Sequence, residues 1–162
     1  MIDQKDFDRL APLASQWAKV QEAYILQQGV PLTAAQTADA RRAGVQDPGR
    51  VRVLVVDRIP LPETKELADA ARRAQIITDA SCGVAIGHGI IIRADSWKNR
   101  ELLLHQLVHV AQCERSGGLE SFVTQYLLDR RGSRDFSLGS LEDEARMLAK
   151  EICAGHPAKR SA

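Results

Sequence analysis

Apolar residues recur at three- and four-residue steps in the amino-terminal part of the chain, which is the period of one helix face. The members of this stripe are Phe7, Leu10, Leu13, Ala14, Trp17, Val20, Tyr24 and Ile25. They predict an amphipathic helix that ends near Gly29. A second, alanine-rich helix is expected over residues 33–43, closed by Gly44. Two helices are therefore expected to fill residues 1–46.

The pattern changes period in the next part of the chain. Residues 51–56 are largely β-branched and apolar and predict a strand, whereas residues 63–74 return to the helical period. Further apolar runs are short enough to be strands, and the last two flank a glycine-rich turn as a hairpin. These runs are residues 76–78, 83–86 and 90–92, and the turn is Gly87-His88-Gly89. We expect the strands to form a small antiparallel sheet.

A helix that begins near Asn99 dominates the second half of the chain. Asn99 is placed to cap this helix, which is expected to end at Ser116-Gly117-Gly118. Its leucines, valines and alanines lie around nearly the whole circumference instead of along one stripe. We therefore expect this helix to be buried on most sides.

Two more helices are expected toward the carboxyl end. The first covers residues 119–130 and is followed by a polar loop over residues 131–139. Ser140 and Asp143 resemble a capping box, which opens a final helix that ends near Ala154. The sequence therefore places a helix on either side of the polar loop.

The switches between helical and strand periods predict one α+β domain over residues 1–162, with helices around a small antiparallel sheet. Its core is expected within residues 51–154, followed by a polar tail over residues 155–162. A length of 162 residues with 44% hydrophobic and 27% charged residues fits one globular domain with its own core.

Charge and cysteine content disfavour several classes of partner and location. The net charge is +1 with both signs interspersed, so we expect no nucleic-acid partner and no anionic membrane surface. The chain begins with charged residues and has no apolar run of the roughly 18 residues that a spanning helix needs, so we expect a soluble protein. Three cysteines without a C-x-x-C pair fit a reducing cytosol, which predicts a cytoplasmic location.

The run H-Q-L-V-H, from His105 to His109, carries the candidate chemistry. Residues four apart on a helix share one face with Cβ atoms roughly 5–6 Å apart, so both imidazoles can reach one tetrahedral Zn²⁺. The alternative is that the rings only make structural hydrogen bonds inside a core. Because the helix is otherwise apolar, where an unpartnered imidazole is costly, the sequence favours a metal site with both histidines as ligands.

The third ligand is expected from the final helix. Glu142 and Glu144 border its buried stripe on opposite sides, and periodicity leaves both open. The alternative is that both are solvated charges that suit the helix dipole in the first turn. Gln112 projects from the face of His105, where its amide can hydrogen-bond the site or a neighbouring backbone group.

Residues 105–112, H-Q-L-V-H-V-A-Q, resemble the active-site helix H-E-L-x-H-V-x-Q of zincin-type metallopeptidase domains. The run L-E-D-E-A that begins at Leu141 is similar to the L-E-x-E-A segment of the same domains, and the resemblance extends over about residues 51–148. It implies a zincin-like fold, a bound Zn²⁺, and Glu142 as the third ligand with Glu144 as the fallback. Arg146 stands where the wider clan frequently has Asp.

Gln106 departs from this pattern, in which Glu at the second position acts as general base on water. An amide has no proton affinity at neutral pH, so activity is expected to be weak or absent. Any catalysis would be metal-assisted amide hydrolysis, with Glu144 as a substitute base. The alternative function is a pseudo-peptidase binding module that holds a peptide or a partner protein. A third possibility is the same fold without any metal.

Further features have simpler explanations beside functional ones. Cys113 lies near the ligand face, where a thiolate is a soft ligand, but a buried structural thiol is the simpler explanation. His88 between two glycines is expected to be a turn residue. By the resemblance, the strand at residues 90–93 forms the sheet edge that lines the cleft, and such an edge can bind an extended peptide by strand addition.

Overall fold

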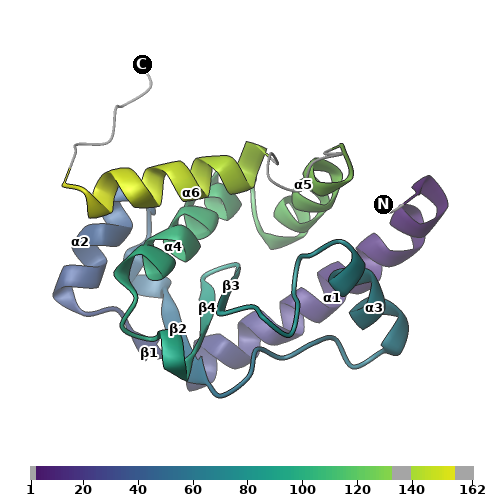
Figure 1. The fold of residues 1–162 in the computed structure, drawn as a ribbon, viewed down its shortest axis with the longest axis horizontal. Helices are drawn as coiled ribbons and strands as arrows, with labels where there is room; N and C mark the ends of the chain where they lie inside the picture. The colour runs from purple at the N-terminus through teal and green to yellow at the C-terminus, as the bar shows by residue number, and fades with distance from the viewer. Residues whose placement is uncertain (1–2, 133–139, 156–162) are drawn as a thin grey trace.

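The computed structural model describes residues 3–132 and 140–155 of the chain (Figure 1). In these ranges six α-helices surround a four-stranded sheet, which confirms a fold of mixed α+β class. The helices are α1 (Gln4–Gln28), α2 (Ala34–Arg42), α3 (Lys65–Arg73), α4 (Arg100–Arg115), α5 (Leu119–Gly132) and α6 (Ser140–Cys153). The strands are β1 (Val30–Pro31), β2 (Arg52–Val56), β3 (Gly83–Ile86) and β4 (Gly89–Arg93), and short 3₁₀ turns lie at Pro48–Arg50 and Ala94–Ser96.

The sheet has the strand order β1-β2-β4-β3 and is mixed, so the prediction of an antiparallel sheet is wrong. β3 and β4 form the predicted antiparallel hairpin, but β2 pairs with β4 in parallel. The connection between them contains α3, and a crossover of this length is what a parallel pair requires. Residues 76–78 form no strand, because Ile76 N donates to the Ala71 carbonyl at 2.9 Å in the turn that ends α3.

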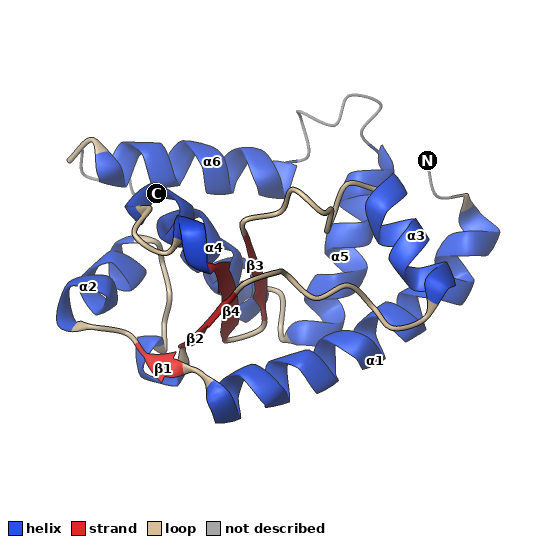
Figure 2. Ribbon diagram, turned by 60° about the horizontal axis from the view of Figure 1, so that its bottom comes forward, coloured by secondary structure: helices blue, strands red, loops and turns tan. Residues whose placement is uncertain are grey.

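The expected edge strand lies in the interior of the sheet. β4 is paired on both sides, and the edge beside it is β3. Ile90 and Ile92 belong to the core cluster under α4 and α6, whereas Ile91 packs in the cluster under α1. A strand that is apolar on both faces is typical of a central position, which explains the difference. Figure 2 shows α1 along one face of the sheet and α4 with α6 along the other.

α4 is the buried helix that the sequence predicts. The Asn99 side chain accepts the Leu102 N–H at 3.0 Å and begins the helix, and Gly117 and Gly118 follow its end with φ angles of 94° and 130°. α6 packs along α4 (Figure 1), so the amino end of α6 lies beside the middle of the buried helix. This contact brings the two motif segments together.

The start of α6 differs from the predicted capping box. Ser140 is the first helical residue, and its N–H and hydroxyl donate to Asp129 Oδ1 at 3.3 and 2.7 Å. The N–H of Leu141 donates to Asp129 Oδ2 at 3.2 Å, while Asp143 accepts a hydrogen bond from Arg146. A carboxylate from α5 therefore satisfies the first amides of α6. Most of the predicted loop 131–139 and of the tail 155–162 lies outside the described residues.

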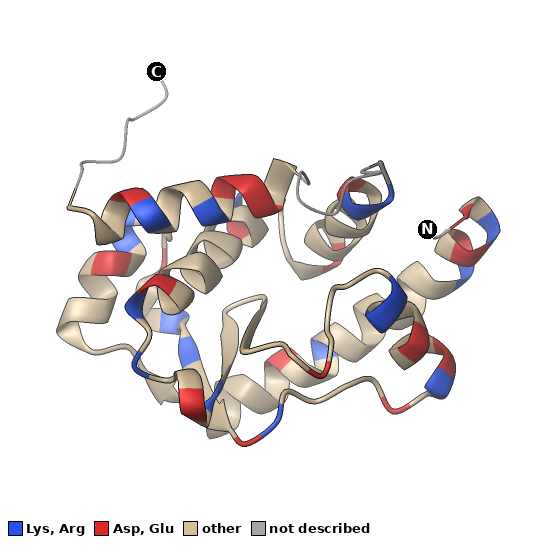
Figure 3. Cartoon of the chain, in the orientation of Figure 1, with Lys and Arg blue, Asp and Glu red and all other residues tan. Residues whose placement is uncertain are grey.

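Acidic and basic residues follow one another along the same helices, as Figure 3 shows for α1 and α6. The described part of the chain contains no helix that is both long and apolar enough to cross a bilayer. The expectation that nucleic acid is not a partner is not tested by this arrangement and stays a prediction.

Candidate metal centre

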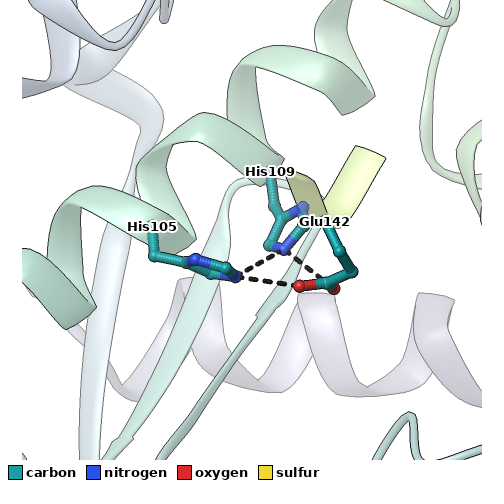
Figure 4. A group of neighbouring side chains, drawn as sticks. All are labelled: His105, His109 and Glu142. Atoms are coloured by element: carbon teal, nitrogen blue, oxygen red, sulfur yellow. Dashed lines mark hydrogen bonds and ion pairs between the residues drawn. The ribbon is translucent and has the colours of Figure 1, made fainter. Parts of the chain in front are cut away.

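Three side chains from α4 and α6 point toward one another (Figure 4): His105, His109 and Glu142, called the metal triad below. The two Nε2 atoms of the histidines lie 3.1 Å apart. His105 Nε2 is 3.1 Å from Glu142 Oε2, and His109 Nε2 is 3.2 Å from Glu142 Oε1. Within the described residues, this is the one group of potential metal-ligating side chains that converges.

The helix geometry explains why both imidazoles take part. His105 and His109 are one turn apart on α4, and their rings meet edge to face with centroids 4.8 Å apart. Glu142 reaches them from the first turn of α6, where the packing of the two helices places it. The side chain of His109 is 8% exposed, whereas those of His105 and Glu142 are 24% and 27% exposed, so solvent reaches the site beside both of these residues.

Gln112 determines the tautomer of His109. The amide nitrogen of Gln112 donates to the Leu141 carbonyl at 2.9 Å and to Glu144 Oε2 at 2.7 Å. Its oxygen therefore faces His109 Nδ1, at 2.8 Å, and an amide oxygen can only accept. Nδ1 of His109 carries the proton in this arrangement, and the Nε2 lone pair of the neutral ring points into the metal triad. Support of this kind behind a ligand histidine is common in metal sites.

Glu144 lies behind Gln112 and outside the metal triad. Its carboxylate accepts hydrogen bonds from Gln112 and from Arg115, the latter at 2.9 and 3.0 Å. The structure thus brings Glu142, and not the fallback Glu144, to the two imidazoles. Glu144 forms an ion pair with Arg115 and lies outside the metal triad, so the geometry does not support the expectation of Glu144 as a substitute base.

Tyr126 of α5 belongs to the site, and the sequence analysis missed it. Its hydroxyl donates to Glu142 Oε1 at 2.5 Å, and its ring lies edge to face with that of His109. Burial and then the charge of Glu142 raise the pKa of Tyr126 well above its ordinary value, so the phenol keeps its proton. With Oε1 engaged by the phenol, Oε2 remains for His105 and for a cation. No spacing relates Tyr126 to the histidine motif, since it comes from another helix.

Glu142 is ionised in this setting. Burial favours the protonated acid, but the contacts of the carboxylate with His105 and His109 and the hydrogen bond from Tyr126 outweigh burial and hold the pKa of Glu142 well below its ordinary value. The carboxylate therefore carries a full negative charge between two imidazoles at neutral pH.

The donor set fits a small divalent cation. The Nε2 of His109 and both oxygens of Glu142 are acceptors, and acceptors at 3.1–3.2 Å repel one another unless a proton or a cation lies between them. Ligand atoms around a tetrahedral ion with bonds of about 2.0–2.1 Å lie roughly 3.3 Å apart. The observed separations are within a few tenths of an ångström of this spacing, so the residues present could hold a small divalent cation.

Gln106 lies beside the metal triad in the cavity wall. It is buried, and a Cβ atom on Gly83 of the edge strand would stand 3.5 Å from Gln106 Cγ and Nε2. Gln106 and the metal triad line one cavity of about 320 Å³. The residue at the position of the expected general base therefore faces the space where a ligand would lie, next to the free edge of the sheet.

The remaining candidates lie outside the metal triad. Burial, followed by the charges of Glu22 and Glu114, raises the pKa of Cys113 to about 12, so it stays a neutral buried thiol. His88 lies in the predicted turn after Gly87, whose φ is 62°, and its Nε2 is 3.1 Å from Glu114 Oε2. The sequence analysis did not foresee this contact.

Arg146 is exposed and donates to Asp143, so it gives no support to the metal triad. The resemblance places an aspartate at this position in other domains. In this chain the hydrogen-bond partner behind His109 is Gln112. Comparison of the chain with protein-family models, with curated proteins and with solved structures finds no match.

Proposed function

We propose that this protein is a zinc-binding, zincin-like domain of the metallopeptidase type that is inactive or weakly active. His105, His109 and Glu142 bind Zn²⁺, and Gln106 stands in place of the general base. The observation that carries the proposal is the convergence of two imidazole nitrogens and one carboxylate at 3.1–3.2 Å on a buried helix pair. The motif resemblance adds the reaction class, metal-assisted amide hydrolysis.

In this proposal the metal triad binds the ion, and the neighbouring side chains position its three members. Zinc, when bound, would supply the Lewis acidity that polarises an amide carbonyl. Gln112 holds the His109 ring with its Nε2 lone pair toward the ion, and Tyr126 holds one carboxylate oxygen of Glu142. Gln106 keeps the length and hydrogen-bonding reach of glutamate, but its amide accepts no proton at neutral pH. Loss of a general base typically lowers the rate by about 10²–10⁴-fold.

Metal analysis tests the binding half of this proposal. Protein purified without chelators, and protein reloaded with Zn²⁺ after dialysis against a chelator, should each hold one zinc ion per chain. Titration with Mn²⁺ and Ni²⁺ in parallel measures the preference among divalent ions. A chain that takes up no divalent ion at stoichiometric amounts would remove the proposal.

The Gln106→Glu variant tests the catalytic half. A zinc-loaded variant should gain general peptidase activity of about 10²–10⁴-fold over the parent chain, because only the base is added. Gln125→Glu on the exposed face of α5 makes the same chemical change outside the site and should gain nothing. Removal of zinc should abolish the gained activity, which separates it from a contaminating peptidase.

The alternative is a pseudo-peptidase binding module that holds a peptide or a partner protein. Two observations favour it: Gln106 cannot act as a base, and it lies against the edge strand β3. An edge strand has unpaired backbone groups to which an extended peptide can add. A zinc-loaded Gln106→Glu variant that still turns over no substrate would favour this binding role over a disabled enzyme.

A further inference from the structure

The cavity beside the metal triad extends along α1. Six residues at three- and four-residue steps form one of its walls: Phe7, Leu10, Ala11, Ala14, Trp17 and Ala18. With a rise of 1.5 Å per residue, this stripe is about 16 Å long. The cavity is therefore much longer than the space around a single metal ion.

The walls opposite α1 are also apolar. α3 contributes Leu67, Ala70 and Ala71, α5 contributes Phe122 and Val123, and the edge strand β3 closes another side. The polar side chains in the wall are those of the metal triad, Gln106 and Tyr126, together with Gln75 and Arg130. The cavity thus joins one polar, metal-ligating region to a long apolar region.

The length and the lining of the cavity select the kind of group that fits it. The apolar stripe of roughly 16 Å along α1 offers an aliphatic chain contacts along its length, but its side chains, apart from the Trp17 indole, offer no hydrogen bonds to the amides of a peptide backbone. A cavity of about 320 Å³ with mostly apolar walls and a few polar groups is typical of sites that bind small molecules.

We propose that the ligand of this protein carries a long unbranched aliphatic group, which lies in the cavity along α1 while its amide or carboxyl head faces the metal triad. The substrate or bound partner then carries an acyl or alkyl chain next to its amide or carboxyl group. This inference rests on the proposed function for the head group. The apolar region alone accounts for the tail, so the two parts can be tested separately.

Two hydroxamates serve as probes, because the hydroxamate head chelates zinc and the tail can be varied. Octanohydroxamate has six more methylenes than acetohydroxamate, and each buried methylene is worth about threefold in affinity. We expect octanohydroxamate to bind the zinc-loaded protein on the order of 100-fold or more tighter than acetohydroxamate. In zinc-free protein, octanohydroxamate should still bind, whereas acetohydroxamate should not.

Different results would contradict the aliphatic site and the metal centre. Equal affinities for the two hydroxamates would overturn the aliphatic site, even if both bind only with zinc. Tail-dependent binding without any effect of zinc would support the cavity and remove the metal centre from the proposed function. Tighter binding of 3-phenylpropanohydroxamate than of octanohydroxamate would also overturn the proposal, since the occupant would then be an aromatic side chain.

A variant that fills the cavity gives the structural control. Ala14→Phe places a ring in the α1 wall and should remove most of the advantage of the octanoyl tail, leaving acetohydroxamate binding unchanged. Ala23→Phe makes the same change at an exposed position of the same helix and should leave both affinities unchanged. Should Ala14→Phe fail to fold, Trp97→Phe leaves Trp17 in the cavity wall as the remaining tryptophan. Its emission should change with octanohydroxamate and not with acetohydroxamate.

Discussion

The described part of the chain contains two partly buried histidine–carboxylate clusters, which differ in how donors and acceptors are paired. In the His88 cluster, made of His88, Glu22 and Glu114, each carboxylate faces hydrogen-bond donors. Glu22 accepts the backbone N–H of His88 at 3.0 Å. The two Glu114 oxygens accept the backbone N–H groups of Gln46 and Asp47 at 2.8 and 3.0 Å. In the metal triad, by contrast, the Nε2 lone pair of His109 faces the carboxylate of Glu142 at 3.2 Å.

Burial does not distinguish the two clusters, because their side chains are 12–20% exposed in one and 8–27% exposed in the other. The difference lies in the balance of donors and acceptors. A cluster in which each acceptor faces a donor is complete and stabilises the fold. A cluster in which acceptors converge needs a proton or a cation between them, and this contrast supports the proposed metal binding between α4 and α6.

Removal of one histidine from each cluster should give the largest difference. His109→Ala is expected to weaken zinc binding on the order of 1,000-fold, since a full ligand set is worth about 10–16 kcal/mol. His88→Ala should leave zinc affinity unchanged and lower the free energy of unfolding by about 1–3 kcal/mol, because Glu114 loses a partner. Zinc titration and urea unfolding measure the two quantities. Loss of zinc binding in His88→Ala would contradict the distinction between the His88 cluster and the metal triad.

Loss of the hydrogen bond between Gln112 and His109 should have the next largest effect on zinc affinity. Gln112→Leu removes the acceptor that orients His109 and is expected to lower zinc affinity about 10–100-fold. The control is Gln46→Leu, the same substitution beside the His88 cluster, where only the backbone N–H contacts Glu114. That control should bind zinc as the parent chain does. An unchanged affinity in Gln112→Leu would show that the orientation of the ring does not depend on this amide.

The pH dependence of the zinc-free protein sharpens the comparison further. The pKa of Glu142 is lowered in the folded state from a value near 4.5, so its carboxylate stabilises the fold above that pH. The stabilisation is lost as the pH falls through the lower, folded-state pKa, with a slope of about 1.4 kcal/mol per pH unit. Glu142→Gln should lack this part of the acid dependence. Urea unfolding from pH 7 to pH 3 measures it, and parallel curves for the two proteins would contradict the assignment.

The capping of α6 should have the smallest effect. Asp129→Ala removes the acceptor for the first amides of the helix that carries Glu142, which should cost about 1 kcal/mol of stability and lower zinc affinity a few-fold. Thr33→Ala removes the capping box of α2 at a similar cost of about 1 kcal/mol but far from the site. The pair separates loss of stability from loss of ligand placement. Equal zinc affinities in the two variants would show that α6 is held without Asp129.

Features with a local cause could be predicted from the sequence. The helical period gives α1 and α4, and the Asn99 cap is formed by a side chain three residues from its partner. The pairing of β2 with β4 and the cap from Asp129 join segments that are distant in the chain, and no local pattern encodes them. The central position of β4 follows from an apolar character on both faces, which the run of isoleucines already contained.

The same distinction applies to the candidate site. The spacing of His105 and His109 places both on one helix face by local geometry alone. The choice of Glu142 over Glu144 came from the motif resemblance, because the stripe of α6 left both open. Tyr126 and the cavity wall on α1 depend on how separate helices pack, and single-sequence periodicity does not contain that information.

X-ray absorption at the zinc edge of the loaded protein tests the metal centre most directly. We expect one zinc ion with nitrogen and oxygen neighbours at about 2.0–2.1 Å, a clear imidazole signature and no sulfur neighbour. The spectrum should lose part of its imidazole signature in His105→Ala. A sulfur neighbour near 2.3 Å, or a spectrum unchanged by that substitution, would contradict the account, because the ion would then be bound elsewhere.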